Sequence, residues 1–285
     1  MKFTKVAVVG GSGTMGNGIV QTVAQSGIQT YLVEMSMEVA EKGKARLDKG
    51  LGRLVEKGKI TEERKQEILG NIVLCDKYED IADVDIVIEA IFENIELKKE
   101  IFAKLDAICK AETILASNTS SLSITEIAAA TKRPDKCIGF HFFNPVPLMP
   151  LVELITGLFC SEETYAASEE LCVQIGKKFV KAKDTPGFLV NYLQIPLLIG
   201  AVQALENGLA SAEDIDKACV FGMNHPMGPL HLLDMIGLDN ALDVFTIMYE
   251  STGEAKFKPC TLHKRLVQSG NWGRKTGKGF FTYES

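Results

Sequence analysis

The first two thirds of the chain alternate short apolar runs with segments whose apolar residues recur at helical spacing. The apolar runs predict strands at Val6–Val9, Thr30–Glu34, Ile72–Cys75, Val84–Glu89, Thr113–Ala116, Ile138–Phe142, Leu151–Ile155 and Lys178–Lys183. The helical spacing predicts helices at Met15–Ser26, Met37–Lys57, Thr61–Leu69 and Asn94–Cys109, and a short helix after the capping box of Ser123 and Glu126. This alternation predicts a Rossmann-type α/β fold with a doubly wound, mostly parallel sheet.

The pattern changes at Asp184-Thr185-Pro186-Gly187, after which the apolar spacing is helical almost to the end. Helices are predicted at Phe188–Glu206, Ala212–Phe221, Leu238–Met248 and Thr261–Val267. The segment from Asn224 to Pro229 reads as a turn-rich connector. We therefore expect a Rossmann domain over residues 1–184 and an all-helical domain over residues 185–285.

Composition narrows the functional classes. Hydrophobic residues make up 46% of the 285 residues and charged residues 24%, which is typical of a globular protein. The net charge of −6 argues against nucleic acid as the main partner. The seven cysteines are scattered without a C-x-x-C pair, which favours a reduced, cytoplasmic protein without a disulfide framework or zinc site.

The longest apolar stretch does not predict a membrane protein. Phe188–Leu205 approaches membrane-spanning length, but it contains Asn191, Gln194, Pro196 and Gln203. We expect a buried or interface helix there and no membrane partner. The N-terminal apolar run, Val6–Val9, is too short for a signal peptide.

A glycine-rich loop follows the first predicted strand and opens a helix. Its six residues match G-x-G-x-x-G and are Gly11, Ser12, Gly13, Thr14, Met15 and Gly16. In this context the pattern indicates a dinucleotide site, with the pyrophosphate at the helix N-terminus. Glu34 ends the second strand and can accept hydrogen bonds from the ribose hydroxyls, which favours NAD over NADP. The alternative is a glycine-rich turn in another α/β protein.

Two further segments carry candidate chemistry. His141 ends a predicted strand, and Glu153 lies twelve residues on in a second strand. An imidazole there can take the proton of a substrate hydroxyl, and a carboxylate can orient it, although a hydrogen-bonded core histidine is the plain alternative. The polar run Ser117–Leu122 also follows a strand; it is either a turn or a surface that meets nicotinamide and substrate.

Together these motifs resemble the 3-hydroxyacyl-CoA dehydrogenase family over essentially the whole chain. The resemblance rests on seven segments in the family's order: Gly11–Gly16, Glu89–Glu93, Ala116–Leu122, His141–Pro145 with Leu151–Glu153, Asp184–Asn191, His225–Pro229 and Gly273–Phe280. It implies an NAD-dependent enzyme that interconverts short-chain (S)-3-hydroxyacyl-CoA and 3-ketoacyl-CoA without a metal. The short bacterial enzymes that act on 3-hydroxybutyryl-CoA are the most similar members.

The resemblance also implies residue roles. His141 is the general base and Glu153 its partner, while Ser120 and Asn191 hydrogen-bond the reacting part of the substrate. The implied NAD contacts are Glu93, Lys98, Asn118, Ser120, Asn144 and Lys275. Arg53 and Lys57 match the position of the CoA nucleotide, although two cations on one helix face are also typical of a solvated surface.

Further expectations come from the second domain and from departures. Asn191 lies in that domain, so the resemblance implies a cleft between the domains, and the apolar helix there implies a homodimer. Gly10 replaces a branched apolar residue and predicts a loosened strand end. Pro150 replaces a frequent lysine, and Tyr192 replaces an arginine, which removes a fixed charge without removing a group that proton or hydride transfer needs.

Two rival functions stay open at this point. One is a dehydrogenase of similar fold that acts on a free 3-hydroxy acid, since such relatives share the histidine motif. The other is a non-catalytic protein built on the same fold. Turnover of free 3-hydroxybutyrate would favour the first, and NADH binding without any turnover of acetoacetyl-CoA would favour the second.

Overall fold

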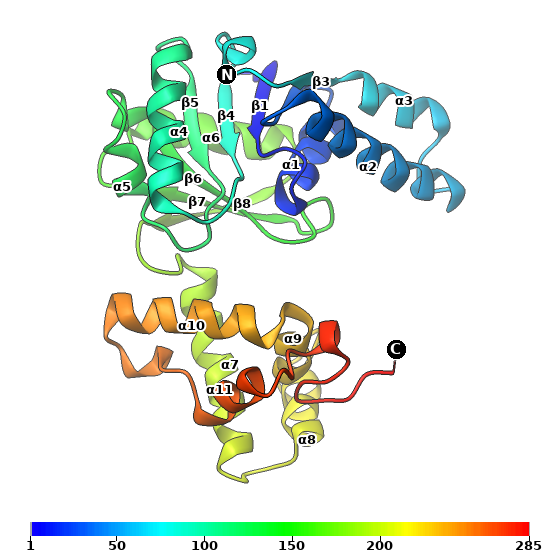
Figure 1. The fold of residues 1–285 in the computed structure, drawn as a ribbon, viewed down its shortest axis with the longest axis vertical. Helices are drawn as coiled ribbons and strands as arrows, with labels where there is room; N and C mark the ends of the chain where they lie inside the picture. The colour runs from blue at the N-terminus through cyan, green and yellow to red at the C-terminus, as the bar shows by residue number, and fades with distance from the viewer. Residues whose placement is uncertain (1, 285) are drawn as a thin grey trace. The chain divides into compact units, whose positions relative to one another are not determined.

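The computed structural model describes residues 2–284, and the chain divides into two compact units, Met1–Thr185 and Pro186–Ser285. The N-terminal unit is built on one sheet of eight strands in the order β3-β2-β1-β4-β5-β6-β7-β8 (Figure 1). The strands are β1 (Lys5–Val9), β2 (Gln29–Val33), β3 (Ile72–Cys75), β4 (Ile86–Glu89), β5 (Ile114–Ser117), β6 (Cys137–Phe142), β7 (Leu151–Thr156) and β8 (Lys178–Lys183). This confirms the predicted fold class.

The first six strands of the sheet are parallel, and the direction reverses once. β7 runs antiparallel to β6, and β8 runs parallel to β7. β1 lies between β2 and β4, so the chain leaves β1 toward one side and later returns to the other. In open α/β sheets, ligands bind outside the carboxyl ends of the strands at such a switch point.

Helices cover both faces of this sheet, because its strands alternate their buried side chains. Val6 and Val8 of β1 belong to one apolar core, and Ala7 and Val9 to the other. The helices of this unit are α1 (Thr14–Gln25), α2 (Met37–Glu56), α3 (Glu62–Gly70), α4 (Ile95–Ile108), α5 (Ile124–Ala128) and α6 (Glu162–Gln174). Residues of α1, α2, α3 and α6 enter the first core, and residues of α4 and α5 enter the second.

The C-terminal unit is helical and has a core of its own. Its helices are α7 (Val190–Glu206), α8 (Ala212–Lys217), α9 (Pro229–Ile236), α10 (Leu238–Thr252) and α11 (Thr261–Gln268) (Figure 1). Ile199 of α7, Leu233 of α9 and Phe245 of α10 are almost completely buried in one cluster. Isolated β-bridges join Gly273 to Lys278 and Lys278 to Thr282 near the end. Among the described residues, no helix is long and apolar enough to cross a membrane.

Two helices were not predicted. α6 fills the segment between β7 and β8, and α9 begins inside the turn-rich segment that contains Pro229. Ser161 caps α6 by accepting a hydrogen bond from the Thr164 amide, as an N-cap residue should. In contrast, α9 receives its cap from Asp216, a residue in α8, whose carboxylate accepts hydrogen bonds from the amides of Leu230 and His231.

Candidate active site

The glycine-rich loop lies at the carboxyl end of β1, next to the switch point of the sheet. α1 begins at Thr14 and its N-cap residue, Gly13, provides no side-chain hydrogen bond, so the amides of its first turn point toward the loop without a side-chain cap. Gly16 must be glycine for a packing reason, because an added Cβ would lie 2.1 Å from the Gly10 carbonyl oxygen. The loop therefore closes tightly on the helix and leaves a bare helix N-terminus that suits a pyrophosphate.

The expectation of a loosened strand end at Gly10 is wrong. The Gly10 amide donates to the Val33 carbonyl over 3.0 Å, and its φ of +79° lies in the left-handed region. An added Cβ would lie 2.8 Å from the Ala90 carbonyl oxygen. Gly10 thus lies in the tight turn that follows β1 and packs against the backbone of Ala90, which leaves no room for a side chain at this position.

Glu34 is fixed to the glycine loop by Ser12. Its Oε1 accepts hydrogen bonds from the Ser12 amide, over 2.8 Å, and from the Ser12 hydroxyl. Arg46 of α2 donates to the Ser12 carbonyl over 2.9 Å. The Glu34 carboxylate is therefore held at the end of β2 beside the loop, where it can meet ribose hydroxyls. Bare glycine backbone and an oriented carboxylate together fit the adenosine and pyrophosphate part of NAD.

His141 and Glu153 form a buried pair across the antiparallel strands. They are directly opposite each other in the register of β6 and β7, and His141 Nδ1 lies 2.8 Å from Glu153 Oε2. Only 7% of His141 and none of Glu153 is exposed. The His141 ring also contacts the Phe143 ring, with centroids 4.7 Å apart. The pair is therefore held in one orientation before any ligand arrives.

Asn118, in the polar run after β5, is hydrogen-bonded to the backbone next to His141. The Asn118 Oδ1 accepts a hydrogen bond from the amide of Phe142, the residue after His141, over 2.9 Å. The Asn118 amide donates to the Glu89 carbonyl over 2.7 Å. Asn118 consequently ties the ends of β4, β5 and β6 together at the edge where His141 lies.

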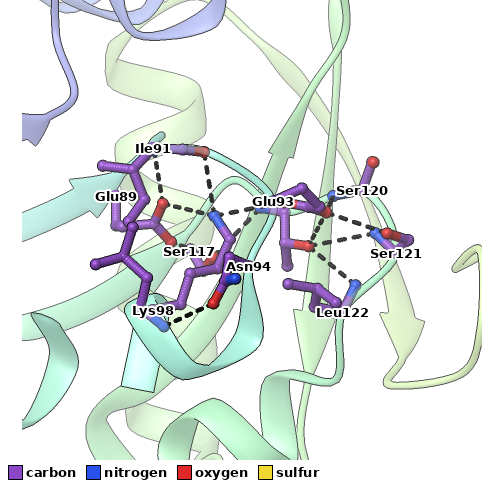
Figure 2. Close-up of polar contacts among 11 residues, drawn as sticks. Glu89, Ile91, Glu93, Asn94, Lys98, Ser117, Ser120, Ser121 and Leu122 are labelled. Carbon is purple, nitrogen blue, oxygen red and sulfur yellow. Dashed lines mark hydrogen bonds and ion pairs between the residues drawn. The ribbon is translucent and has the colours of Figure 1, made fainter. Parts of the chain in front are cut away.

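Ser120 is held by Glu93. Glu93 Oε1 accepts hydrogen bonds from the Ser120 amide over 3.0 Å, from the Ser121 hydroxyl over 3.1 Å, and from the Thr119 hydroxyl (Figure 2). Because one carboxylate oxygen receives all three bonds, the turn after β5 has a defined shape. The Ser120 hydroxyl is thereby presented from an ordered turn.

Lys98 lies beneath this turn. It is 1% exposed, and its Nζ lies 2.6 Å from Glu89 Oε1, 3.4 Å from Glu93 Oε2 and 3.4 Å from the Ile91 carbonyl (Figure 2). An ammonium group has three N–H donors, and these three acceptors account for them. The geometry therefore places Lys98 behind Glu93, inside the protein.

Glu89 is a central residue that the sequence analysis did not single out. Its completely buried carboxylate accepts hydrogen bonds from Lys98, from the Ile91 amide over 2.7 Å and from the Ser117 hydroxyl over 2.7 Å. A carboxylate at the end of the apolar strand of residues 86–89 was the available signal, because a buried acid needs partners.

The remaining predicted residues lie further along the chain. Asn144 is exposed in the connection between β6 and β7, directly after Phe143. Arg53 and Lys57 are exposed and lie one turn apart at the end of α2. In the C-terminal unit, Asn191 lies in the first turn of α7. In the same unit, Lys275 pairs with Asp239.

Tyr192 is in contact with the ammonium group of Lys256. The Lys256 ammonium donates to the Tyr192 hydroxyl over 2.5 Å and lies 3.8 Å from the centroid of its ring. The ring also packs edge-on against Phe257, with centroids 5.4 Å apart. An ammonium group therefore lies next to position 192, and it also pairs with the Glu254 carboxylate over 2.8 Å.

The cysteines offer no reactive thiol at this site. All seven are unpaired, and burial raises the pKa of Cys75, Cys109, Cys160 and Cys260 to about 11. The thiolate form needed for nucleophilic attack is therefore disfavoured at neutral pH. Among residues 2–284, no group of three or more His, Cys, Asp or Glu side chains could hold a metal ion.

Comparison with known proteins identifies the family. Residues 5–185 match the NAD binding domain of 3-hydroxyacyl-CoA dehydrogenase, and residues 187–283 match its C-terminal domain. The chain is 48% identical to a 3-hydroxybutyryl-CoA dehydrogenase of Clostridioides difficile, over 98% of this chain and 99% of that protein. It is 46% identical to a probable 3-hydroxybutyryl-CoA dehydrogenase of Bacillus subtilis, over 98% of both chains.

A solved structure agrees. The crystal structure of (S)-3-hydroxybutyryl-CoA dehydrogenase from Ralstonia eutropha superposes with a TM-score of 0.95 at 45% identity, covering 100% of both chains. The glycine loop and Glu34 thus belong to an NAD-binding domain with a known counterpart. The chain belongs to the family of NAD-dependent 3-hydroxyacyl-CoA dehydrogenases.

Proposed function

We propose that this enzyme interconverts (S)-3-hydroxybutyryl-CoA and acetoacetyl-CoA, with His141 as the acid–base residue and Glu153 as its partner. The observation that carries the mechanism is the buried 2.8 Å contact between His141 Nδ1 and Glu153 Oε2 at the carboxyl end of β6. The substrate is proposed because the relatives from Clostridioides difficile and Ralstonia eutropha carry that activity in their names.

The histidine–glutamate geometry fits a proton transfer to oxygen. With Glu153 ionised, His141 donates from Nδ1 to the carboxylate, and Nε2 is then the basic nitrogen. In oxidation, His141 takes the proton of the C3 hydroxyl, and Glu153 stabilises the imidazolium that forms. In reduction, His141 returns the proton to the C3 oxygen. Bound NAD supplies the other half of the chemistry by accepting or donating the hydride at C3.

The polar residues of the sheet edge would orient the reactants. We assign Ser120 and Asn191 to hydrogen bonds with the reacting part of the substrate. Asn118, Asn144 and Glu93 are assigned to the cofactor side, and Lys275 is a further cofactor contact. For Lys98 the buried geometry favours an indirect role, in which it holds Glu93 and so the Ser120 turn.

The two ends of the reactants would be recognised by charge. Glu34 would accept hydrogen bonds from the adenosine ribose of NAD and would repel the 2′-phosphate of NADP. Arg53 and Lys57 would hold the 3′-phosphate of CoA, since both are exposed cations on one side of α2. We further propose a homodimer formed through the helical unit, in which the 65% exposed Leu193 of α7 would be covered.

Steady-state kinetics tests this function. With NADH, acetoacetyl-CoA should be reduced with a higher kcat/KM than a long-chain 3-ketoacyl-CoA or free acetoacetate. The kcat/KM for acetoacetyl-CoA should also be higher with NADH than with NADPH. Preference for the free acid would identify a dehydrogenase of another substrate class. NADH binding without turnover of any of these substrates would identify a non-catalytic member of the family. Light scattering at micromolar concentration tests the dimer.

A further inference from the structure

Lys177 is a buried lysine that is not among the predicted site residues. It lies in the turn between α6 and β8 and is 8% exposed. Its Nζ donates to the Val146 carbonyl over 2.5 Å and to the Met149 carbonyl over 2.7 Å. Burial lowers the pKa of the Lys177 amine. In the described part of the chain, residues 2–284, the structure gives this ammonium no carboxylate partner.

Both acceptors belong to the connection between β6 and β7. This connection directly follows His141 and Phe142 and carries Asn144 and Pro145. The Pro145 carbonyl accepts hydrogen bonds from the amides of Leu148 and Met149, each over 3.0 Å, so the connection forms a closed turn. The single ammonium group of Lys177 therefore binds two residues of this turn, Val146 and Met149.

The same connection also packs against α1. Val146 is 2% exposed, and an ideal Cβ on Gly18 would lie 2.8 Å from the Val146 Cβ. Pro147 would also be in contact, with its Cδ 3.4 Å away. Gly18 lies two residues after Gly16, at the start of the helix that follows the glycine loop. Val146 is thus held by two contacts, its carbonyl by the ammonium of Lys177 and its side chain against the bare backbone of α1 at Gly18.

We propose that Lys177 is a positioning residue for the cofactor side of the active site. It fixes the position of the connection that carries Asn144 relative to β6, which contains His141, and relative to the first turns of α1. It acts through Val146 and Met149 and does not contact the reactants. The inference rests on the proposed cofactor contact of Asn144. A charged group is suited to this task because an ammonium can donate to two carbonyls at once, which an apolar side chain of equal length cannot do.

The test compares Lys177→Met with two matched variants. Lys177→Arg keeps several donors, and Lys178→Met changes the next residue, whose side chain is exposed and whose ordered contact is its backbone amide on the Pro150 carbonyl. NADH binding is followed by fluorescence titration, and turnover of acetoacetyl-CoA by steady-state kinetics. We expect Lys177→Met to raise the Kd for NADH and lower kcat/KM by about 10- to 100-fold, the size that a misplacement near 1 Å produces. Lys177→Arg should recover most of the loss, and Lys178→Met should match the parent.

A double-mutant cycle separates positioning from general structural damage. If Lys177 acts through the Asn144 connection, Lys177→Met should cause little further loss once Asn144→Ala is present, because coupled residues are not additive. Additive losses, or parental NADH binding in Lys177→Met, would overturn the proposal. Should Lys177→Met fail to fold, Gly18→Ala gives an independent test, since its methyl group would lie 2.8 Å from the Val146 Cβ and must displace Val146. Gly18→Ala should raise the Kd for NADH with the same dependence on Asn144, and parental binding in that variant would also overturn the proposal.

The proposed function and this inference fail in different ways. If the parent protein reduces no 3-ketoacyl-CoA, the proposed function is wrong, while NADH titration of the variants still tests Lys177. If the parent is active and Lys177→Met binds NADH normally, only the inference is wrong.

Discussion

The two units of this protein each contain a histidine whose Nδ1 meets a carboxylate, and the two pairs do different things. His141 lies 2.8 Å from Glu153, and His231 lies 2.5 Å from Asp216. Asp216 also accepts hydrogen bonds from the amides of Leu230 and His231, so it is the N-terminal cap of α9. His231 stacks on Phe281 with ring centroids 3.8 Å apart. The pair of His231 and Asp216 therefore stabilises the start of α9 and its packing against the C-terminal segment at Phe281.

The surroundings therefore decide what a histidine–carboxylate pair does. Glu153 comes from a neighbouring strand at an edge of the NAD-binding domain that also holds Asn118 and Ser120. Asp216 is committed to backbone amides, and an added Cβ on Gly228 would lie 2.1 Å from its Cγ. A carboxylate that caps a helix contributes stability, whereas one that pairs with an imidazole at a ligand edge can support proton transfer.

The largest expected effect comes from breaking the strand pair. His141→Ala should lower kcat by about 10²–10⁴-fold, which is the contribution of a positioned general acid–base group. Glu153→Gln should lose a smaller part of the rate, because the imidazole keeps a neighbour that cannot stabilise its charge. Steady-state reduction of acetoacetyl-CoA measures both, and NADH titration checks that the cofactor still binds. His231→Ala serves as the control and should keep the parental kcat. Near-normal turnover by His141→Ala would falsify the catalytic assignment.

The second effect comes from breaking the helical pair. Asp216→Ala removes the cap of α9, and replacing such a cap costs about 0.5–2 kcal/mol. Its 5% exposure places the loss at the upper end. Calorimetry should show a fall of several degrees in the Tm of the helical unit, while Asp243→Ala, on the exposed side of α10, should not. If Asp216→Ala has the same Tm as the parent, the cap contributes nothing to stability. The structural role given to the pair of His231 and Asp216 would then be wrong.

A third histidine sharpens the comparison because it has a carbonyl in place of a carboxylate. His263 is 1% exposed, and its Nε2 lies 2.7 Å from the Leu238 carbonyl. Burial lowers the pKa of His263, and the bond to Leu238 opposes this only in part. The folded protein therefore binds this proton less readily than the unfolded chain does. Stability should fall as the pH drops below about 6.5, by at most about 1.4 kcal/mol per pH unit.

His263→Gln tests this slope, since the glutamine amide can still donate to Leu238 but cannot be protonated in this range. Urea unfolding at pH 7.5, 6.5 and 5.5 should show a shallower loss of stability in the variant than in the parent. Identical slopes in the two proteins would mean that other groups cause the acid sensitivity.

The smallest effect belongs to Arg53 and Lys57, which are exposed and for which the structure gives no salt-bridge partner among residues 2–284. Arg53→Ala/Lys57→Ala should raise KM for acetoacetyl-CoA several-fold and leave kcat almost unchanged, because such contacts hold the ground state and transition state equally. The effect should shrink with added salt. Assays with a truncated pantetheine thioester provide the comparison. An equal loss with both substrates would indicate damage elsewhere than in CoA binding.

The sequence was sufficient for the sheet, because strands rest on local patterns of apolar residues. The resemblance implies that Glu153 partners His141, and the structure places the two in contact, while their catalytic role stays a prediction. Eight predicted strands correspond to the eight observed ones within about two residues, the usual disagreement at element ends. α9 was missed because its capping residue, Asp216, lies 14 residues from Leu230 and in another helix. Its start at Pro229 looks like a turn when only neighbours are considered.

The buried lysines could not be predicted for a similar reason. The resemblance implies a cofactor contact for Lys98 and says nothing of its burial. Lys177 was not singled out, because lysine is normally exposed. Their burial depends on acceptors brought together by the sheet: Glu89 and Glu93 for Lys98, and two carbonyls of the β6–β7 connection for Lys177. No spacing rule along one strand or helix contains that information.

The single antiparallel step of the sheet has a consequence for how the enzyme folds. Since β6 and β7 are joined directly, His141 and Glu153 close a chain segment of only 12 residues. Loop-closure entropy grows with segment length, so this contact is cheap to form compared with the parallel pairings, which need long crossovers. His141 can thus be oriented by a local hairpin early in folding. The pair should already be assembled in the ligand-free protein, so that the proposed proton-transfer site is complete before cofactor and substrate bind.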